Sequence, residues 1–205
     1  MYIAVINYNM GNIKSVANAF LSLGINIEVT CSPEVIMNAS GVVLPGVGAF
    51  HDAVKNLKDL NLYNTIKEVI KQNRPFLGIC IGLQVLFECG TEGQICSGLG
   101  IFRGNVEKIP PGFKIPHMGW NGIKIIKKDS KIFKDIKDGE SFYFVHSYSA
   151  VPQDLSIISS TVEYGSELVS SIEYGNTFGL QFHPEKSSLC GLKILNNFAD
   201  MAFNN

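Results

Sequence analysis

The sequence predicts an α/β fold in which helices cover both faces of a central sheet. Up to Gly98, short apolar runs alternate with stretches whose apolar residues recur at helical spacing, which indicates parallel strands joined by helices. After Gly98, β-like runs follow one another, which indicates antiparallel or mixed strands that extend the sheet. The length of 205 residues and the hydrophobic content of 46% suit one such unit. We therefore expect a single three-layer domain over residues 1–205.

The elements of the first half follow from apolar runs and helical spacing. Between the first two strands, apolar residues at helical spacing predict a helix that ends at Gly24, a residue typical of helix C-caps. A second helix of this kind ends before Pro75, and a third is expected over 81–88, directly after a strand. The expected strands are residues 2–6, 26–30, 41–44 and 76–79.

The second half has mainly strand signals. Its last stretch, residues 189–202, places Leu192, Leu195, Phe198 and Ala202 on one side and predicts a closing helix. The expected strands are residues 123–126, 142–145, 155–162, 168–174 and 177–182.

The charge and hydropathy of the chain exclude several classes of partner. The formal net charge of −1 gives no electrostatic reason to expect nucleic acid or an anionic membrane. The first residues lack the basic and apolar regions of a signal peptide, and no apolar run is long enough for a membrane span. We expect a soluble, cytoplasmic protein.

The cysteines are irregularly spaced at Cys31, Cys80, Cys89, Cys96 and Cys190. Their number is odd and no two form a Cys-x-x-Cys pair, so the pattern predicts free thiols and neither a disulfide framework nor a zinc site. We expect no metal and no tightly bound cofactor.

Cys80 has an unusual sequence environment, because Gly78 and Gly82 flank it between a predicted strand and a predicted helix. This pattern is typical of a nucleophile elbow, a sharp turn that exposes a reactive side chain at the carboxyl edge of a sheet. The start of the helix favours the thiolate, and the N–H of Ile81 can face an oxyanion. A buried structural cysteine at a strand end is the alternative, and the motif alone leaves both open.

The triplet His183-Pro184-Glu185 follows a predicted strand directly. A histidine at that edge can deprotonate Cys80 and later protonate a leaving amine, as acyl transfer requires. Glu185 lies two residues further and can orient the imidazole. A surface histidine beside a turn is the alternative for a lone histidine, but the order Cys, His, Glu favours a catalytic triad.

A second glycine-rich loop, LPGVGAF, occupies residues 44–50. It is not a dinucleotide-binding fingerprint, because His51 stands where the third glycine would be needed. We interpret it as a loop whose N–H at Val47 supplies a second oxyanion donor. A plain strand-to-helix turn is the alternative.

Six stretches together resemble the class I, triad-type glutamine amidotransferases, and within them the glutaminase subunits of imidazole glycerol phosphate synthases. The PHMGWN and YFVHSY stretches are similar to that subfamily in particular. The six are YNMGNIKSV (8–16), LPGVGAF (44–50), GICIGLQVLFE (78–88), PHMGWN (116–121), YFVHSY (143–148) and GLQFHPEKS (179–187).

The resemblance implies a flavodoxin-like three-layer mixed sheet and a hydrolysis of L-glutamine to glutamate and ammonia. Cys80 is similar to the nucleophile that forms a γ-glutamyl thioester, and His183 and Glu185 are similar to its triad partners. The backbone of Val47 and Ile81 would form the oxyanion hole. Residues similar to those that hold the glutamine are Gly48, Gln84 and Glu92.

The resemblance also implies a partner, a (β/α)8-barrel cyclase subunit that consumes the ammonia in histidine biosynthesis and forms a heterodimer with this chain. Hydrolysis would stay slow until that partner binds its nucleotide, with the loop at Val47 as the switch. The residues in motifs that the family uses near the interface are Asn12, Met118, Trp120, Tyr143 and Lys186. From composition alone, Trp120 suits a protein contact or a core equally well.

One stretch departs from the resembled pattern, because Asn7-Tyr8-Asn9 stands where the family has Asp-Tyr-Gly. This leaves open a paralogue that supplies ammonia to a synthase aminating bacterial surface or sialic-acid-like sugars. A self-contained cysteine hydrolase would explain Cys80 and His183 but not the interface motifs. A subunit that has lost catalysis is a third alternative, but the presence of all three triad candidates counts against it.

Overall fold

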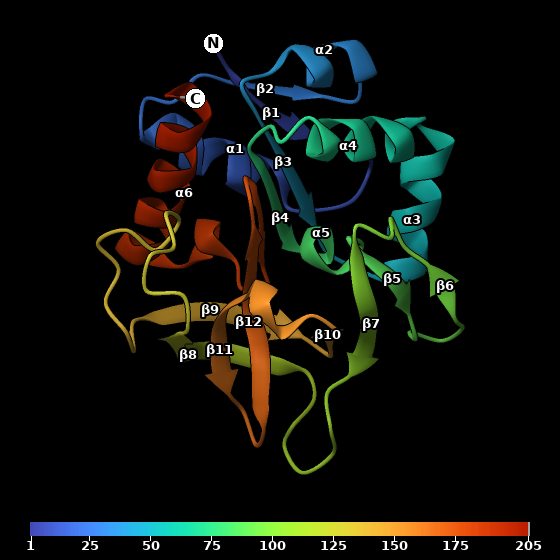
Figure 1. The fold of residues 1–205 in the computed structure, drawn as a ribbon, viewed down its shortest axis with the longest axis vertical. Helices are drawn as coiled ribbons and strands as arrows, with labels where there is room; N and C mark the ends of the chain where they lie inside the picture. The colour runs from blue at the N-terminus through green and yellow to red at the C-terminus, as the bar shows by residue number, and fades with distance from the viewer. Residues whose placement is uncertain (205) are drawn as a thin grey trace.

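A computed structural model describes residues 1–204, and its centre is a nine-stranded sheet in the order β2-β1-β3-β4-β13-β12-β11-β8-β9 (Figure 1). The first five strands in this order are parallel and have the 2-1-3-4-5 arrangement of flavodoxin-like sheets. Their bounds are β1 Ile3–Ile6, β2 Ile27–Thr30, β3 Gly41–Gly46, β4 Phe76–Cys80 and β13 Thr177–Leu180. The predicted α/β fold with a mixed sheet is confirmed.

Helices cover both faces of the parallel strands. Helices α1 and α6 lie against each other on one face, while α3 and α4 lie on the other face, with α2 beside α4 (Figure 1). The bounds are α1 Ile13–Ser22, α2 Pro33–Asn38, α3 Phe50–Asp59, α4 Leu62–Lys71 and α6 Ser188–Phe203. No helix of residues 1–204 is long and apolar enough to cross a membrane.

The remaining four strands of the large sheet are antiparallel and extend it beyond β13. Their bounds are β8 His117–Ile125, β9 Ser141–His146, β11 Ile158–Glu163 and β12 Glu167–Tyr174. The prediction of one strand over 155–162 is wrong at its start, because residues Leu155–Ile157 form a 3-10 turn. Asp154 accepts a hydrogen bond from the N–H of Ser156 at 2.9 Å and thereby caps that turn.

A second sheet of four strands, in the order β10-β7-β5-β6, was not predicted. The bounds are β5 Phe87–Gly90, β6 Cys96–Ser97, β7 Phe102–Lys108 and β10 Tyr148–Pro152. The expectation that all strands extend one sheet is therefore wrong. Strands β9 and β10 are separated by Ser147 alone, so the chain passes from one sheet to the other at this point.

The helix expected over 81–88 is also wrong in length. Helix α5 spans Ile81–Gln84, a single turn, and Phe87 already belongs to β5. Phe87 is fully buried and pairs with Phe102 of β7, so tertiary packing overrides the helical spacing of this short apolar run. Because α5 has one turn, the dipole argument for a Cys80 thiolate is weaker than the sequence suggested.

Candidate active site

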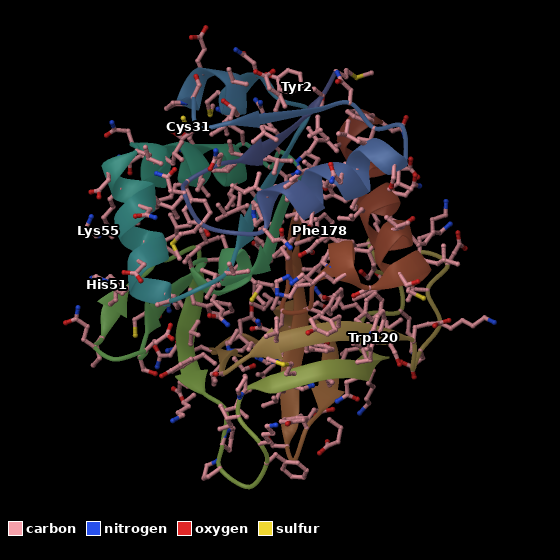
Figure 2. All side chains as sticks on the ribbon, turned by 180° about the vertical axis from the view of Figure 1, so that it is seen from behind. Tyr2, Cys31, His51, Lys55, Trp120 and Phe178 are labelled. Carbon is pink, nitrogen blue, oxygen red and sulfur yellow. The ribbon has the colours of Figure 1, made fainter. Side chains whose placement is uncertain are left out.

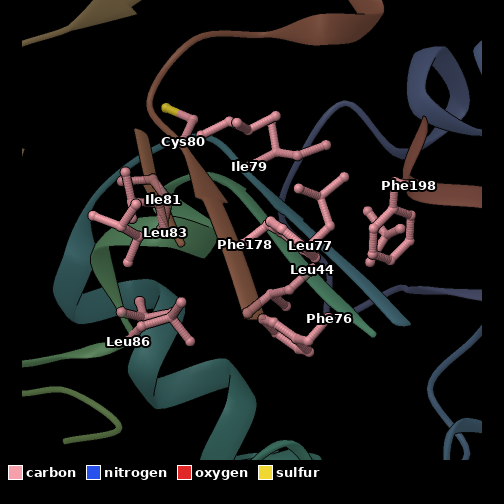
Figure 3. Close-up of a cluster of buried hydrophobic side chains, with 14 of the residues drawn as sticks. Leu44, Phe76, Leu77, Ile79, Cys80, Ile81, Leu83, Leu86, Phe178 and Phe198 are labelled. Atoms are coloured by element: carbon pink, nitrogen blue, oxygen red, sulfur yellow. The ribbon is translucent and has the colours of Figure 1, made fainter. Parts of the chain in front are cut away.

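Cys80 ends β4 in a backbone conformation that L-residues rarely adopt, with φ 55° and ψ −107°. Strand β3 lies beside it, with Gly46 opposite Cys80 in the register. Figure 3 shows the sulfur at the end of the strand, pointing away from the side chains of Phe76 and Leu77 that fill the core. The predicted sharp turn at the carboxyl edge of the sheet is thus present, and Cys80 is 4% exposed.

The two flanking glycines leave no room for a side chain. A Cβ at Gly82 would lie 1.9 Å from the carbonyl oxygen of Leu44, and one at Gly78 would lie 2.5 Å from that of Gly82. Both contacts are to backbone, which cannot move without shifting β3 or α5. The glycines therefore allow the close approach of β3, β4 and α5 that forces Cys80 into its turn.

His183 and Glu185 form a buried pair. His183 follows β13 by three residues, and the 3-10 turn Pro184–Lys186 places Glu185 against the same imidazole. The Nδ1 of His183 lies 2.9 Å from Oε1 of Glu185, and each side chain is 1% exposed. Since a carboxylate accepts, Nδ1 carries the proton and Nε2 is free to act on Cys80.

The electrostatics of His183 favour its charged form. Burial alone lowers its pKa, but the neighbouring Cys80 and Glu185 side chains outweigh burial and raise the pKa to about 9. Its Nε2 is buried and makes no hydrogen bond within residues 1–204. A buried nitrogen without a partner, next to a thiol, suits proton exchange with that thiol or with a substrate held beside it.

A cavity of about 390 Å³ opens over Cys80. Six residues expected from sequence line it together: Val47, Gly48, Cys80, Ile81, Gln84 and Glu92. Val47 comes from the loop after β3, and Ile81 is the first residue of α5. Five further lining residues come from the β7–β8 loop and from the crossing between β9 and β10: Pro116, Val145, His146, Ser147 and Tyr148.

Two of the expected substrate residues already have partners in the protein. Oε2 of Glu92 accepts a hydrogen bond of 2.9 Å from the N–H of Phe50 and so caps α3. The amide nitrogen of Gln84 donates to the carbonyl of Tyr148 and to Oε1 of Gln181, each at 3.0 Å. In each of the two side chains, Oε1 makes none of these bonds and is free to contact a substrate.

The sequence argument missed Gln181 and the pair His117–His146, although all three lie inside quoted motifs. Nε2 of Gln181 lies 3.6 Å from the Cys80 sulfur. Nδ1 of His117 lies 3.0 Å from Nε2 of His146, and burial lowers the pKa of each histidine to about 4. No periodicity singles these residues out, because they are separated by strands that come together only in the folded sheet.

The residues expected at a partner interface lie largely on one surface. Met118 and Trp120 are 61% and 55% exposed on the same side of β8. Tyr143 of β9 stands opposite Trp120, their rings 6.2 Å apart, and Nζ of Lys186 lies 5.8 Å from the Tyr143 ring centre. Figure 2 shows Trp120 on the side of the molecule away from His51 and Lys55 of α3.

This surface is connected to the buried pair through the backbone. The N–H of His183 donates to the carbonyl of Tyr143 at 2.9 Å, and the N–H of Tyr143 donates to Oγ of Ser187 at 3.0 Å. Asn12 lies elsewhere, at the start of α1, where its Oδ1 accepts from Oγ of Ser15. Strand β9 is therefore bonded directly to the backbone of His183.

Known proteins are similar to this chain over nearly its whole length. The sequence matches the family described as glutamine amidotransferase class-I over residues 4–201. The chain belongs to the class I glutamine amidotransferase family. Within the family it is 48% identical to imidazole glycerol phosphate synthase subunit HisH of Moorella thermoacetica, over 97% of this chain and 94% of that protein. It is 49% identical to the subunit HisH of Aquifex aeolicus, over 97% of this chain and 96% of that one.

Solved structures support the same fold at much lower identity. A structure titled glutamine amidotransferase matches with a TM-score of 0.74 and 17% identity, covering 99% of this chain and 100% of its own. The glutaminase domain of Trypanosoma brucei CTPS with bound acivicin matches with a TM-score of 0.72 and 15% identity, covering 100% and 94%. The class I amidotransferase fold thus extends over nearly the whole chain.

Proposed function

We propose that this amidotransferase is the glutaminase subunit of imidazole glycerol phosphate synthase and hydrolyses L-glutamine at Cys80. The observation that carries the proposal is the strained Cys80 in the wall of a cavity, next to a histidine whose charged form is favoured. The relatives at 48% and 49% identity, both named as subunits of that synthase, support the same assignment.

The proposed reaction has two steps. The Cys80 thiolate attacks the side-chain amide carbon of glutamine, and the tetrahedral intermediate collapses as His183 gives its Nε2 proton to the departing ammonia. Water, activated by the same imidazole, then attacks the γ-glutamyl thioester, releasing glutamate and restoring the thiolate. Glu185 keeps the proton on Nδ1 and stabilises the imidazolium throughout.

The cavity wall supplies the remaining roles. We assign the oxyanion to the backbone N–H groups of Val47 and Ile81, which flank Cys80 from the two glycine-rich loops. Gly48, with φ 101°, gives the first of these loops its freedom to reorient. We assign the substrate's ammonium group to Glu92 and its polar atoms to Oε1 of Gln84 and the backbone of Gly48.

The product ammonia implies a partner, because ammonia released into neutral water is protonated and no longer nucleophilic. We assign that partner as a (β/α)8-barrel cyclase subunit, which binds the surface formed by Met118, Trp120, Tyr143 and Lys186 and also contacts Asn12 at the start of α1. An exposed tryptophan packed edge-on against a tyrosine is typical of interface hot spots. The backbone hydrogen bond from the N–H of His183 to the carbonyl of Tyr143 links this surface to the catalytic histidine.

Release of glutamate from glutamine tests the proposal. It is measured with the purified chain alone, with the barrel cyclase, and with the cyclase and its nucleotide. A Cys80→Ala variant is the control for chemistry, and Cys31→Ala, which removes an exposed thiol, is the matched control. We expect strong activity in the complete mixture, abolished by Cys80→Ala and unaffected by Cys31→Ala.

Two results would count against the proposal. Full activity of the chain alone would favour a self-contained hydrolase. Absence of stimulation by a competent cyclase, with Cys80 still reactive, would favour a paralogue that serves a different acceptor, such as a sugar-aminating synthase.

A further inference from the structure

Gln181 is a polar residue in an apolar setting. It is 0% exposed and lies between Leu180 and Phe182, which are also 0% exposed. A buried amide destabilises the folded state unless its hydrogen bonds are made, so its partners are informative. Within residues 1–204 its side chain bonds to two groups, the amide of Gln84 and the sulfur of Cys80.

The orientation of the Gln181 amide is fixed by a backbone carbonyl. The carbonyl of Tyr148 can only accept, so the atom of Gln84 that lies 3.0 Å from it is the nitrogen. The same nitrogen faces Gln181 at 3.0 Å, so the atom of Gln181 on that side is the oxygen. The nitrogen of Gln181 therefore faces the Cys80 sulfur, at 3.6 Å.

The position of Gln84 follows from α5. Gln84 is the last residue of this single turn, Cys80 directly precedes the turn, and both line the same cavity. Gln181 comes from the end of β13 on the neighbouring strand and bridges the two. The contact is thus built from β4, α5 and the segment after β13, all of which have buried backbones.

The carbonyl of Tyr148 is itself held in place. Nδ1 of His146 lies 2.8 Å from this carbonyl and must carry its proton, so Nε2 of His146 accepts from Nδ1 of His117 at 3.0 Å. His117 stacks on Phe144 and Tyr164, with ring centres 4.7 Å and 4.0 Å apart. One continuous series of hydrogen bonds runs from His117 of β8 to the nucleophile.

An N–H donor aimed at sulfur stabilises a thiolate more than a thiol, because the acceptor is then charged. Gln181 donates without being titratable, so its effect persists at every pH. The titratable groups that also lie near Cys80 are His183 and the buried hydroxyl of Tyr8, and three more line the same cavity, namely Glu92, His146 and Tyr148.

We propose that Gln181 is a positioning residue, which holds the Cys80 sulfur as a thiolate aimed into the glutamine cavity and is itself held by Gln84, the Tyr148 carbonyl and the His146–His117 pair. This inference rests on the proposed role of Cys80 as the nucleophile. It adds to the triad a donor that is neither a base nor part of the oxyanion hole.

The test is the rate at which iodoacetamide alkylates Cys80 as a function of pH, followed by peptide mass mapping. Gln181→Met keeps the shape of the side chain and removes the donor, and Gln181→Asn keeps the amide but is too short to reach. Gln84→Met removes the support of Gln181. Ser170→Ala is the matched control, because Ser170 is fully buried and bonds to Gln181 through its backbone carbonyl, which the variant retains.

We expect alkylation of Cys80 at pH 7 to fall about tenfold in Gln181→Met, with the midpoint of the pH profile about one unit higher. Gln181→Asn is expected to behave in the same way, and Gln84→Met to shift in the same direction by less. With the partner present, kcat for glutamine should fall with KM changed by less than about twofold. Ser170→Ala should match the wild type in all three measurements.

Superimposable alkylation profiles for wild type, Gln181→Met and Gln181→Asn would overturn the proposal, as would an equal shift in Ser170→Ala. If Gln181→Met does not fold, Gln181→Asn and Gln84→Met give the same decision. Alkylation requires neither glutamine nor partner, so it tests the role of Gln181 separately from the proposed function. Wild-type Cys80 that reacts no faster than the exposed Cys31 would refute the proposed function, whereas a reactive Cys80 indifferent to Gln181 refutes this inference alone.

Discussion

Replacement of Glu185 by glutamine gives the sharpest view of how the buried pair works. The variant keeps an oxygen that can accept from Nδ1 of His183 and removes the negative charge. In the wild type, burial lowers the pKa of His183 and Cys80 and Glu185 together raise it, to about 9 from an ordinary value of 6.5. Glu185 is one of two groups that produce this rise, so its charge contributes roughly one pH unit, or about 1.4 kcal/mol.

The assay is the pH dependence of kcat/KM for glutamine hydrolysis by the activated complex. The imidazolium that protonates the leaving ammonia is lost as pH rises through the pKa of His183, so activity declines on the alkaline side near pH 9. In Glu185→Gln this decline should begin about one unit lower, and kcat should fall roughly 10- to 100-fold because the imidazolium loses its counter-charge.

The pH dependence of stability gives an independent check on the direction of the pKa shift of His183. A group whose pKa is raised by folding contributes stability below its unfolded value and loses that contribution as pH rises through the folded value. The free energy of unfolding of the wild type should therefore decline between pH 6.5 and about 9, and less steeply in Glu185→Gln. The control is Glu173→Gln, a half-buried carboxyl bonded to Ser130. An alkaline limb of Glu185→Gln that coincides with the wild type would refute this account of the pair.

Three further results are expected. Gly82→Ala should abolish activity and destabilise the fold by about 2–4 kcal/mol in chemical unfolding, because its Cβ would meet the Leu44 carbonyl at 1.9 Å; wild-type stability would contradict the packing argument. Trp120→Ala should weaken cyclase binding by about 2 kcal/mol in calorimetry with the melting temperature unchanged, while Ile126→Ala, 44% exposed, should leave binding intact. Urea unfolding should show roughly 2 kcal/mol less stability at pH 5 than at pH 6.5. Burial lowers the pKa of His117 and His146 to about 4, so both histidines take up protons when the protein unfolds at pH 5. A flat profile would show that the pair is charged in the native state.

The positions of the parallel strands were the most predictable part of the fold. Buried parallel strands are continuous apolar runs, and the residues of β1, β3 and β4 are uniformly buried in the structure. The glycines around Cys80 were equally informative, because their spacing requires a turn in which three backbones approach closely. Both features are local, so a single stretch of sequence carries them.

The second sheet could not be predicted in the same way. Residues 81–88 have apolar positions compatible with a helix, yet β5 forms because Phe87 finds a partner in Phe102 of β7. Strand β6 has two residues, too few for any periodicity. These strands exist through contacts between segments distant in sequence, and such contacts leave no local pattern.

The residues of the site also differ in whether a local sequence pattern reveals them. Cys80, His183 and Glu185 stand in short motifs whose chemistry is readable from residue types and spacing. Gln181 was overlooked because a glutamine inside an apolar strand has no chemical signature until its neighbours are known. The lesson is physical, since a buried amide is interpretable only through the partners that satisfy it.

The most direct test of the central claim is the fate of the glutamine carbonyl. The complex with its cyclase and nucleotide is mixed with glutamine labelled at the side-chain carbonyl carbon, quenched in acid, and the protein-bound label is located by peptide mass mapping. The account predicts one γ-glutamyl group on Cys80 of the wild type and none in Cys80→Ala. The amount of labelled protein should be larger in Glu185→Gln if loss of the charge slows hydrolysis of the thioester more than its formation. Formation of glutamate with no label on Cys80, or label on a different residue, would contradict it.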